Sequence, residues 1–211
     1  MSIGELPTPT LADEVVRLEP LTREHEAGLV AAVEGSRSTY SWTSVPTVET
    51  VGEYVETQLA RAAAGILAPF VQIEVATDRV VGHTSYLTPR WTAAGRLYAI
   101  EVGTTWLSAR VQGTALNSAA KLMLFRHAFE EWGVDRVDLK TDARNDQSRA
   151  GIAAVGGRFE GVLRAWQPSA VAGEEDQLRD TAMFSITAAE WPGVRGMLRD
   201  RIARKLGSVT E

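Results

Sequence analysis

The sequence predicts a single domain of the mixed α+β class, and three observations support this fold class. Strand-like and helix-like patterns alternate along the chain, and several strand patterns follow one another in its middle. The 211 residues, of which 45% are hydrophobic and 23% charged, are enough to build one full core. No internal repeat, low-complexity tract or linker divides the chain. We expect a loose N-terminal leader at residues 1–14, one domain at 15–195, and a C-terminal helix and tail at 196–211.

The first half of the chain contains the patterns of one strand, two helices and three further strands. Residues 15–21 alternate as a strand does, and Thr22 has the side chain of a helix cap. A polar and aromatic loop at 36–46 separates the two helices. Gly103 lies within the last of these strands, where glycine often marks a bulge or a bound ligand. The expected ranges are 15–21, 24–35, 48–64, 70–75, 80–86 and 97–107.

The second half begins with the clearest helix pattern in the chain, an apolar stripe at helical spacing that Gly133 ends. A strand, a short helix and two more strands follow, which brings the number of expected strands to seven. A capping-box sequence at 187–190 precedes a terminal helix, which we expect Pro192 and Gly193 to break early. The expected ranges here are 115–132, 134–141, 145–155, 159–166 and 181–186.

Composition argues against several kinds of function. The net charge of -5 repels a nucleic-acid backbone, so we expect no nucleic-acid partner. The chain has no apolar stretch of membrane-spanning length and no basic leader, so we expect no membrane partner and a cytoplasmic location. Without cysteine, and with His25, His83 and His127 far apart in the sequence, we expect no disulfide, thiol nucleophile or metal.

The most informative segment is Arg110-Val111-Gln112-Gly113-Thr114-Ala115, between the long strand and the clearest helix. Backbone N–H groups in the first turn of a helix lack internal partners and lie at the positive end of the helix dipole. Such a turn can hold a pyrophosphate, and a glycine at position 113 allows the phosphate to approach the backbone closely. A strand-to-helix turn with one glycine is also common without any ligand, so the pattern alone leaves both interpretations open.

Arg110-x-x-Gly113-x-Ala115 satisfies the signature [QR]-x-x-G-x-[GA] and thereby resembles the GNAT superfamily of N-acetyltransferases, which hold the pyrophosphate of acyl-coenzyme A at this turn. The resemblance extends over about residues 15–195 and is closest to the RimJ/RimL branch, known for N-terminal acetylation of ribosomal proteins. It implies the GNAT fold, a twisted, mixed and mostly antiparallel sheet of about seven strands flanked by helices. The fourth and fifth strands of this sheet splay apart to admit the pantetheine arm. The resemblance also implies acetyl-coenzyme A as co-substrate, with no metal. The segments that carry it include Thr141-Asp142-x-x-Asn145-x-x-Ser148, Glu160-Gly161-Val162-Leu163-Arg164 and Arg179-Asp180-Thr181.

The resemblance implies where coenzyme A is bound. Backbone N–H groups near Trp106 and Leu107 would donate to the thioester carbonyl, and Asn145 would bond the pantetheine amides, although a helix cap is the alternative for Asn145. Lys121 would either reach a coenzyme A phosphate or solvate the helix, and both interpretations stay open. The expected cofactor-binding residues are Trp106, Leu107, Arg110, Val111, Gln112, Gly113, Thr114, Ala115, Asn117, Lys121 and Asn145.

The resemblance also implies two catalytic residues. Glu101 stands where RimJ/RimL-like enzymes carry a carboxylate that takes the amine proton, often through water; otherwise it is an exposed strand glutamate paired with a neighbouring arginine. Many GNAT enzymes protonate the leaving thiolate with a tyrosine at the position of Ile152, so the role shifts here to Ser148 or to water. Without that role, Ser148 is a hydroxyl on the helix surface.

The acceptor pocket implied by the family lies between the loop at 36–46, the segment around Trp91 and the far side of Glu101. Tyr40, Trp42 and Trp91 are candidate walls, although loop aromatics also pack against cores. We therefore predict an N-acetyltransferase that moves acetyl from acetyl-coenzyme A to a small-molecule amine or a peptide N-terminus in a ternary complex, as a monomer or homodimer. The alternatives are a non-catalytic coenzyme A-binding module, an interaction protein with this fold, and an N-acyltransferase that uses another acyl-coenzyme A.

Overall fold

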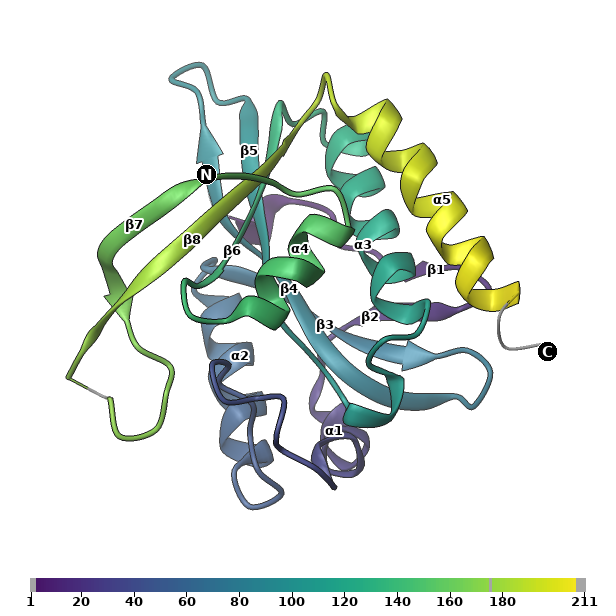
Figure 1. The fold of residues 1–211 in the computed structure, drawn as a ribbon, viewed down its shortest axis with the longest axis vertical. Helices are drawn as coiled ribbons and strands as arrows, with labels where there is room; N and C mark the ends of the chain where they lie inside the picture. Colours follow the sequence, from purple (N-terminus) through teal and green to yellow (C-terminus); the bar gives the residue numbers. More distant parts are fainter. Residues whose placement is uncertain (1–2, 175, 208–211) are drawn as a thin grey trace.

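The computed structural model describes residues 3–174 and 176–207 and confirms the predicted fold class (Figure 1). Across these residues, eight strands form one mixed sheet in the order β1-β2-β3-β4-β5-β6-β8-β7. All neighbouring strands run antiparallel except β5 and β6, which are parallel. The helices cover both faces of this sheet (Figure 1).

The elements of the described chain have the following bounds. The strands are β1 Leu11–Ala12, β2 Val16–Pro20, β3 Leu67–Glu74, β4 Arg79–Trp91, β5 Leu97–Leu107, β6 Arg136–Asp142, β7 Arg158–Pro168 and β8 Leu178–Thr187. The α-helices are α1 Glu26–Val33, α2 Val51–Ala63, α3 Leu116–Arg126, α4 Asp146–Ala154 and α5 Trp191–Gly207. Short 3-10 turns lie at Ile3–Glu5, Arg23–His25 and Ala109–Val111, and a π-helical turn at His127–Glu131 extends α3.

Two expectations about the ends of the chain were wrong. The described part of the leader is packed rather than loose, because Ile3 is buried in the core and β1 pairs with β2. The helix α5 is not broken at Pro192 but continues to Gly207, across the expected boundary at residue 195. Proline is tolerated in the first turn of a helix, where its missing N–H has no partner to lose. Residues 1–2 of the expected leader and 208–211 of the expected tail lie outside the described residues.

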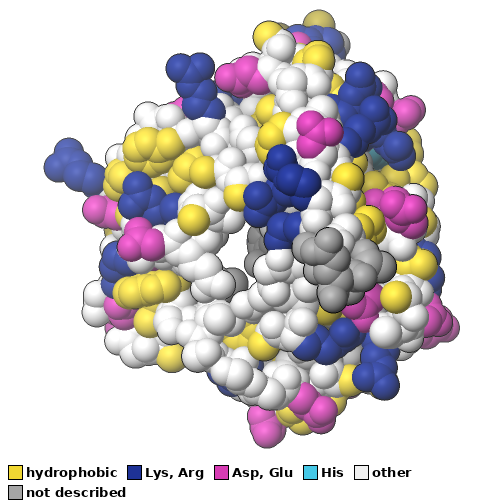
Figure 2. All heavy atoms as spheres, turned by 45° about the vertical axis from the view of Figure 1, so that its right-hand side comes forward, with side chains coloured by type: hydrophobic (Ala, Val, Ile, Leu, Met, Phe, Trp, Pro, Cys, Tyr) yellow, Lys and Arg dark blue, Asp and Glu magenta, His cyan; other side chains and the backbone are white. Residues whose placement is uncertain are grey.

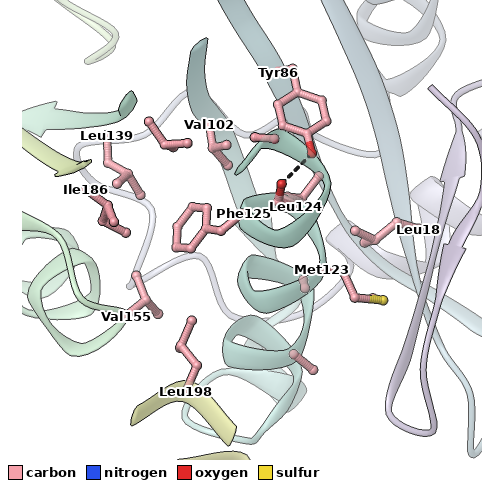
Figure 3. Close-up of a cluster of buried hydrophobic side chains, with 14 of the residues drawn as sticks. Leu18, Tyr86, Val102, Met123, Leu124, Phe125, Leu139, Val155, Ile186 and Leu198 are labelled. Carbon is pink, nitrogen blue, oxygen red and sulfur yellow. Dashed lines mark hydrogen bonds between the residues drawn. The ribbon is translucent and has the colours of Figure 1, made fainter. Parts of the chain in front are cut away.

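Two hydrophobic clusters hold the helices to the sheet. On one face, α1 and α2 pack against β3 and the end of β5. On the other face, α3, α4 and α5 cover the centre of the sheet, and α3 crosses the middle of this larger cluster (Figure 3). Tyr86 of β4 is fully buried there and donates its hydroxyl hydrogen to the carbonyl of Leu124 at 2.6 Å. The helix that follows the glycine motif is thus anchored directly to the sheet.

The sheet opens where β5 and β6 part. Their parallel pairing is confined to residues 99–101 of β5 and 136–138 of β6, whereas both strands continue beyond it. These are the strands that were expected to splay; they are the fifth and sixth in the structure because β1 precedes the first predicted strand. Close to the opening, β5 carries a bulge, since two residues, Thr104 and Thr105, stand opposite Thr84 of β4. Thr104 has a φ of 47°, and the neighbouring Gly103 had predicted such an irregularity.

Candidate active site

The space between the parted strands is a cleft of about 1020 Å³. The loop before α2, the helix α2, the starts of α3 and α4, and parts of β8 and α5 surround it. Figure 2 shows a hollow beside a group of Lys and Arg side chains. Among the described residues, the cleft is lined by more cations than carboxylates: Arg61, Lys121, Lys140, Arg179, Arg201 and Lys205 against Glu53 and Glu101. It is therefore locally cationic in a protein whose net charge is -5.

Most of the residues predicted from the sequence meet in this cleft, although they come from distant parts of the chain. They include members of the expected cofactor site, both expected catalytic residues and two of the three aromatic walls. These residues are Tyr40, Trp42, Glu101, Trp106, Leu107, Gln112, Gly113, Thr114, Asn117, Lys121, Asn145 and Ser148.

Four predicted residues do not line the cleft. Arg110 turns outward and forms an ion pair with Glu74 at 2.8 Å, whereas Val111 and Ala115 are buried in the core. Arg110 and Val111 differ in direction because they are successive residues of the 3-10 turn at Ala109–Val111, whose side chains point to different sides. Trp91 lies at the far end of β4, opposite Leu97, and packs against the core.

The turn before α3 has the backbone geometry that anion binding requires. Gly113 has a φ of +79°, which favours glycine, and the space where a Cβ would stand is open. Within the described chain, the N–H groups of Gly113 and Ala115 donate no backbone hydrogen bond. The hydroxyl of Thr114 donates to the Val111 carbonyl at 2.7 Å and accepts from the Leu116 N–H at 3.3 Å, which fixes the turn. Two unbonded amides therefore lie at the positive end of α3, and one of them belongs to Gly113, which lines the cleft.

The end of β5 offers one further backbone donor. The carbonyl of Leu107 accepts hydrogen bonds from the Tyr40 hydroxyl at 2.7 Å and from Gln112 Nε2 at 3.0 Å, both of which line the cleft. The next N–H, that of Ser108, points the other way and bonds the carbonyl of Val81. Since the N–H and C=O of one strand residue point to the same side, the N–H of Leu107 is directed towards the cleft.

A buried polar chain supports the bulge from behind. The indole of Trp106 donates to the Tyr54 hydroxyl at 3.2 Å, and that hydroxyl bonds Nδ1 of His83 at 2.9 Å. Nδ1 of His83 also lies 3.2 Å from the carbonyl of Thr104. Complete burial lowers the pKa of His83 to about 4, so this imidazole is neutral at neutral pH. Trp106 is therefore held in place by contacts of its own side chain.

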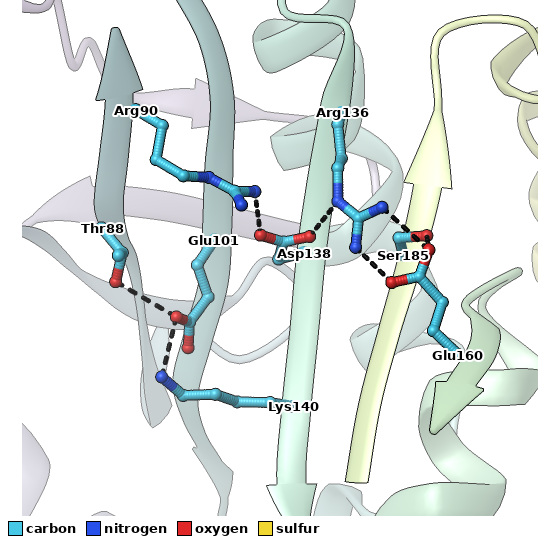
Figure 4. A network of polar contacts seen from close by, with 8 residues as sticks. All are labelled: Thr88, Arg90, Glu101, Arg136, Asp138, Lys140, Glu160 and Ser185. Atoms are coloured by element: carbon cyan, nitrogen blue, oxygen red, sulfur yellow. Dashed lines mark hydrogen bonds and ion pairs between the residues drawn. The ribbon is translucent and has the colours of Figure 1, made fainter. Parts of the chain in front are cut away.

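Glu101 is almost fully buried at the point where β5 and β6 part. Its Oε2 forms an ion pair with Lys140 Nζ of β6 at 3.0 Å and accepts a hydrogen bond from the Thr88 hydroxyl at 3.2 Å (Figure 4). It is thus neither exposed nor paired with an arginine. A second ionic network, in which Asp138 joins Arg90 and Arg136, lies next to it in the same figure. The carboxylate is held at one place by two partners while still bordering the cleft.

Asn145 is the N-cap of α4, because its Oδ1 accepts the N–H of Ser148 at 2.9 Å. Both side chains line the cleft, so the capping interaction also fixes their relative position. Ile152, at the position where many GNAT enzymes have a tyrosine, is buried one turn further along the same wall. It offers no proton to a leaving group.

Lys121 does not solvate the helix surface, and that interpretation was wrong. The residue is 5% exposed, and its Nζ donates to the hydroxyls of Thr105 at 2.8 Å and Thr84 at 3.4 Å. Burial lowers its pKa to about 7. The side chain thus connects α3 to the bulged segment of β5.

Five cationic residues that line the cleft were missed by the sequence analysis, the first of which is Arg61 of α2. Lys140 and Arg179 belong to β6 and β8, and only the order of strands in the sheet brings them there. Arg201 and Lys205 lie one turn apart on α5; Arg201 donates to the Ser118 hydroxyl at 3.2 Å, and Lys205 donates to the Gly113 carbonyl. Their spacing of four residues places both side chains on one face of a helix, which the sequence could have indicated. The helix was expected to break at Pro192, however, so this face was not predicted.

Comparison with known proteins agrees with this geometry. Residues 16–158 match the family described as acetyltransferase (GNAT) domain. The chain belongs to the GNAT acetyltransferase family. This GNAT protein is accordingly an N-acetyltransferase with a mixed α/β GNAT fold. No curated protein matches its sequence.

Several solved structures resemble this GNAT protein along nearly the whole chain. A protein described as an acetyltransferase from T. thermophilus is 28% identical, with a TM-score of 0.78 over 93% of this chain and 98% of that one. A GNAT-family protein from Chromobacterium violaceum is 27% identical, with a TM-score of 0.76 over 91% and 92%. Mycobacterium smegmatis RimJ, solved in complex with CoA-disulfide, is 23% identical and shares the fold, with a TM-score of 0.72 over 95% and 97%.

Two features are absent from the described residues. None of their helices is long and apolar enough to cross a membrane. They contain no group of three or more His, Cys, Asp or Glu side chains arranged to hold a metal ion.

Proposed function

We propose that this enzyme transfers the acetyl group of acetyl-coenzyme A directly to an amine, with both substrates bound in the cleft between β5 and β6. The observation that carries the proposal is the pairing of two features in one cleft. Unbonded amides at the start of α3 lie at one end, and the buried carboxylate of Glu101 lies at the point where the strands part. The first suits a pyrophosphate and the second suits an amine that must lose a proton.

Coenzyme A would lie along the cleft from the turn to the bulge. The pyrophosphate accepts hydrogen bonds from the Gly113 and Ala115 N–H groups, and Arg201 and Lys205 add positive charge beside them. Arg110 and Val111 contribute only through the shape of the turn, since neither side chain reaches the cleft. Further along, Asn117 and Asn145 border the pantetheine arm.

The thioester carbonyl would sit beside the N–H of Leu107, which stabilises the oxyanion formed during attack. The N–H of Trp106 points the other way, towards His83 of β4, and takes no part. The amine nitrogen attacks the acetyl carbon, the C–S bond breaks, and the amine proton passes to Glu101, directly or through water. Lys140 keeps this carboxylate in position by its ion pair. The departing thiolate takes a proton from water, either directly or through the hydroxyl of Ser148, which takes up a proton from water as it gives up its own.

The acceptor would enter past the loop at 39–46. Tyr40 is held by its bond to the Leu107 carbonyl, and Trp42 by the guanidinium of Arg144, whose Cζ lies 4.2 Å from the centre of the indole ring. Two oriented aromatic rings favour an organic amine with some apolar surface. Trp91 has no part in this pocket.

The proposal is tested by incubating the protein with acetyl-coenzyme A and an amine library and measuring free thiol. Because the protein has no cysteine, thiol that appears is released coenzyme A rather than protein. Mass spectrometry of the products should show acetyl on nitrogen. The proposal fails if neither thiol release nor a rise in melting temperature with acetyl-coenzyme A is observed, since binding at a hundredfold excess over Kd adds about 2.7 kcal/mol of stability.

A further inference from the structure

Arg179 is a charged residue of the cleft that the proposed reaction does not use. It lies on β8 opposite Gln167 of β7 and borders the same cleft as Glu101. Its Nε is buried without a hydrogen-bond partner, and within the described chain no carboxylate, carbonyl or hydroxyl pairs with its guanidinium. Since arginine stays charged in proteins, this is a cation placed in a partly desolvated site with nothing to bind.

The carboxylates near Arg179 already have other partners. Asp142 forms an ion pair with Arg144 at 2.8 Å, and Glu101 forms one with Lys140 at 3.0 Å. Loss of water lowers the pKa of Arg179, the charges of Asp142 and Glu101 oppose this shift, and the charge of Arg144 adds to it. The guanidinium is therefore not paired with either carboxylate and is available to a ligand that enters this end of the cleft.

We propose that Arg179 binds a carboxylate carried by the amine acceptor. The inference rests on the proposed function and specifies its substrate class: an amine that also bears a carboxylate, such as a free amino acid. A guanidinium presents two parallel N–H donors that match the two oxygens of a carboxylate, which makes the contact both strong and directional. It would hold the acceptor by one end while its nitrogen faces Glu101.

This assignment also explains why an unpaired charge is retained. Burying an unpaired charge lowers the stability of the free protein, and proteins tolerate such a loss of stability at functional sites. A carboxylate that enters the cleft restores the missing ion pair. An acceptor without a carboxylate leaves the charge unpaired, so the site discriminates against it.

The test compares acceptors that differ only in this group. The standard L-amino acids and their carboxamides are assayed as matched pairs with the wild-type enzyme, R179K, R179Q and the control R164Q, which removes an exposed arginine outside the cleft lining on the neighbouring strand β7. Peptides with Asp or Asn at the second position form a further pair, so that a free amino acid and an acidic peptide N-terminus can be told apart.

We expect the wild-type enzyme to use at least one carboxylate-bearing acceptor with a KM at least tenfold below that of the matching carboxamide. R179Q should raise that KM at least tenfold and leave the KM of the amide unchanged, whereas R164Q should change neither. The KM of R179K for the carboxylate-bearing acceptor should lie between those of the wild type and R179Q, because lysine keeps the charge and loses the paired donors. The melting temperature of R179Q should not fall, and its affinity for coenzyme A should match that of the wild type.

Equal use of both members of every pair, or an equal effect of R179Q on both, would overturn the proposal while leaving acetyl transfer intact. Absence of turnover with every amine would instead refute the proposed function. Binding of N-acetylated amino acids, followed by NMR in wild-type and R179Q protein, tests Arg179 without turnover: the wild type should bind them and R179Q should not, and equal binding contradicts the proposal.

Discussion

Replacing Lys121 by methionine should stabilise this protein at and below neutral pH. Lys121 is buried against Thr84 and Thr105, and its pKa falls from the ordinary 10.5 to about 7. The unfolded chain therefore binds this proton more tightly than the folded one, so the free energy of unfolding rises with pH between about 7 and 10.5. Below pH 7 the folded protein is destabilised by the full cost of burying the charged Lys121, and above pH 10.5 this destabilisation is absent.

The size of this change in stability follows from the shift in the pKa of Lys121. At 1.36 kcal/mol for each unit of pKa, the change from 10.5 to about 7 corresponds to about 5 kcal/mol of lost stability below pH 7. Methionine is similar in size and carries no charge, but it forfeits the hydrogen bond to Thr105, worth about 1 kcal/mol. We expect K121M to gain about 2 to 4 kcal/mol at pH 6, or roughly 4 to 16 °C in melting temperature for a chain of this size.

Calorimetric melting of the wild type and K121M between pH 6 and pH 9.5 measures this difference. The gain should shrink by about 1.4 kcal/mol for each pH unit above 7. K140M is the matched control, because Lys140 lines the same cleft but neutralises Glu101, so its loss should lower the melting temperature. A destabilised K121M at pH 6, or a gain that does not change with pH, refutes the reasoning.

Three further variants test the site directly. E101Q should lower kcat about a hundred- to ten-thousand-fold while isothermal titration shows unchanged coenzyme A affinity; near-normal turnover would exclude Glu101 as the base. G113A should weaken coenzyme A binding and cost about 1 to 2 kcal/mol of stability by denaturant unfolding, because φ there is +79°; an unchanged affinity contradicts the phosphate site. N145A should lose about 1 kcal/mol through the missing cap, and no loss in the same measurement would contradict the capping role.

The sequence was most informative where structure is local. The turn around Gly113, the strand that carries Glu101 and the cap at Asn145 are each defined by a few neighbouring residues, and their positions could be predicted. Lys140 and Arg179 could not, because they reach the cleft only through the pairing of β6 with β5 and of β8 with β6. Such pairing joins residues far apart in the chain, and no local pattern encodes it.

Two errors have equally physical causes. Trp91 was assigned to a loop near the acceptor, but β4 extends as far as this residue, and the strand places its ring against the core. The break expected at Pro192 neglected the position of proline in the first turn, where a helix does not need its N–H. That second error hid Arg201 and Lys205, because both depend on α5 running on to Gly207.

The distribution of charge leads to a final prediction about salt. The net charge of -5 predicts that anionic coenzyme A is repelled and that added salt strengthens binding by screening the repulsion. The cleft itself, however, is lined by more cations than carboxylates, and charges close to a ligand outweigh more distant ones once salt limits their range. We therefore expect the affinity for acetyl-coenzyme A to fall as ionic strength rises, and R201Q together with K205Q to flatten this dependence. An affinity that rises with salt in the wild type would show that the whole-protein charge dominates, and the phosphate end of the cleft would then have to be placed elsewhere.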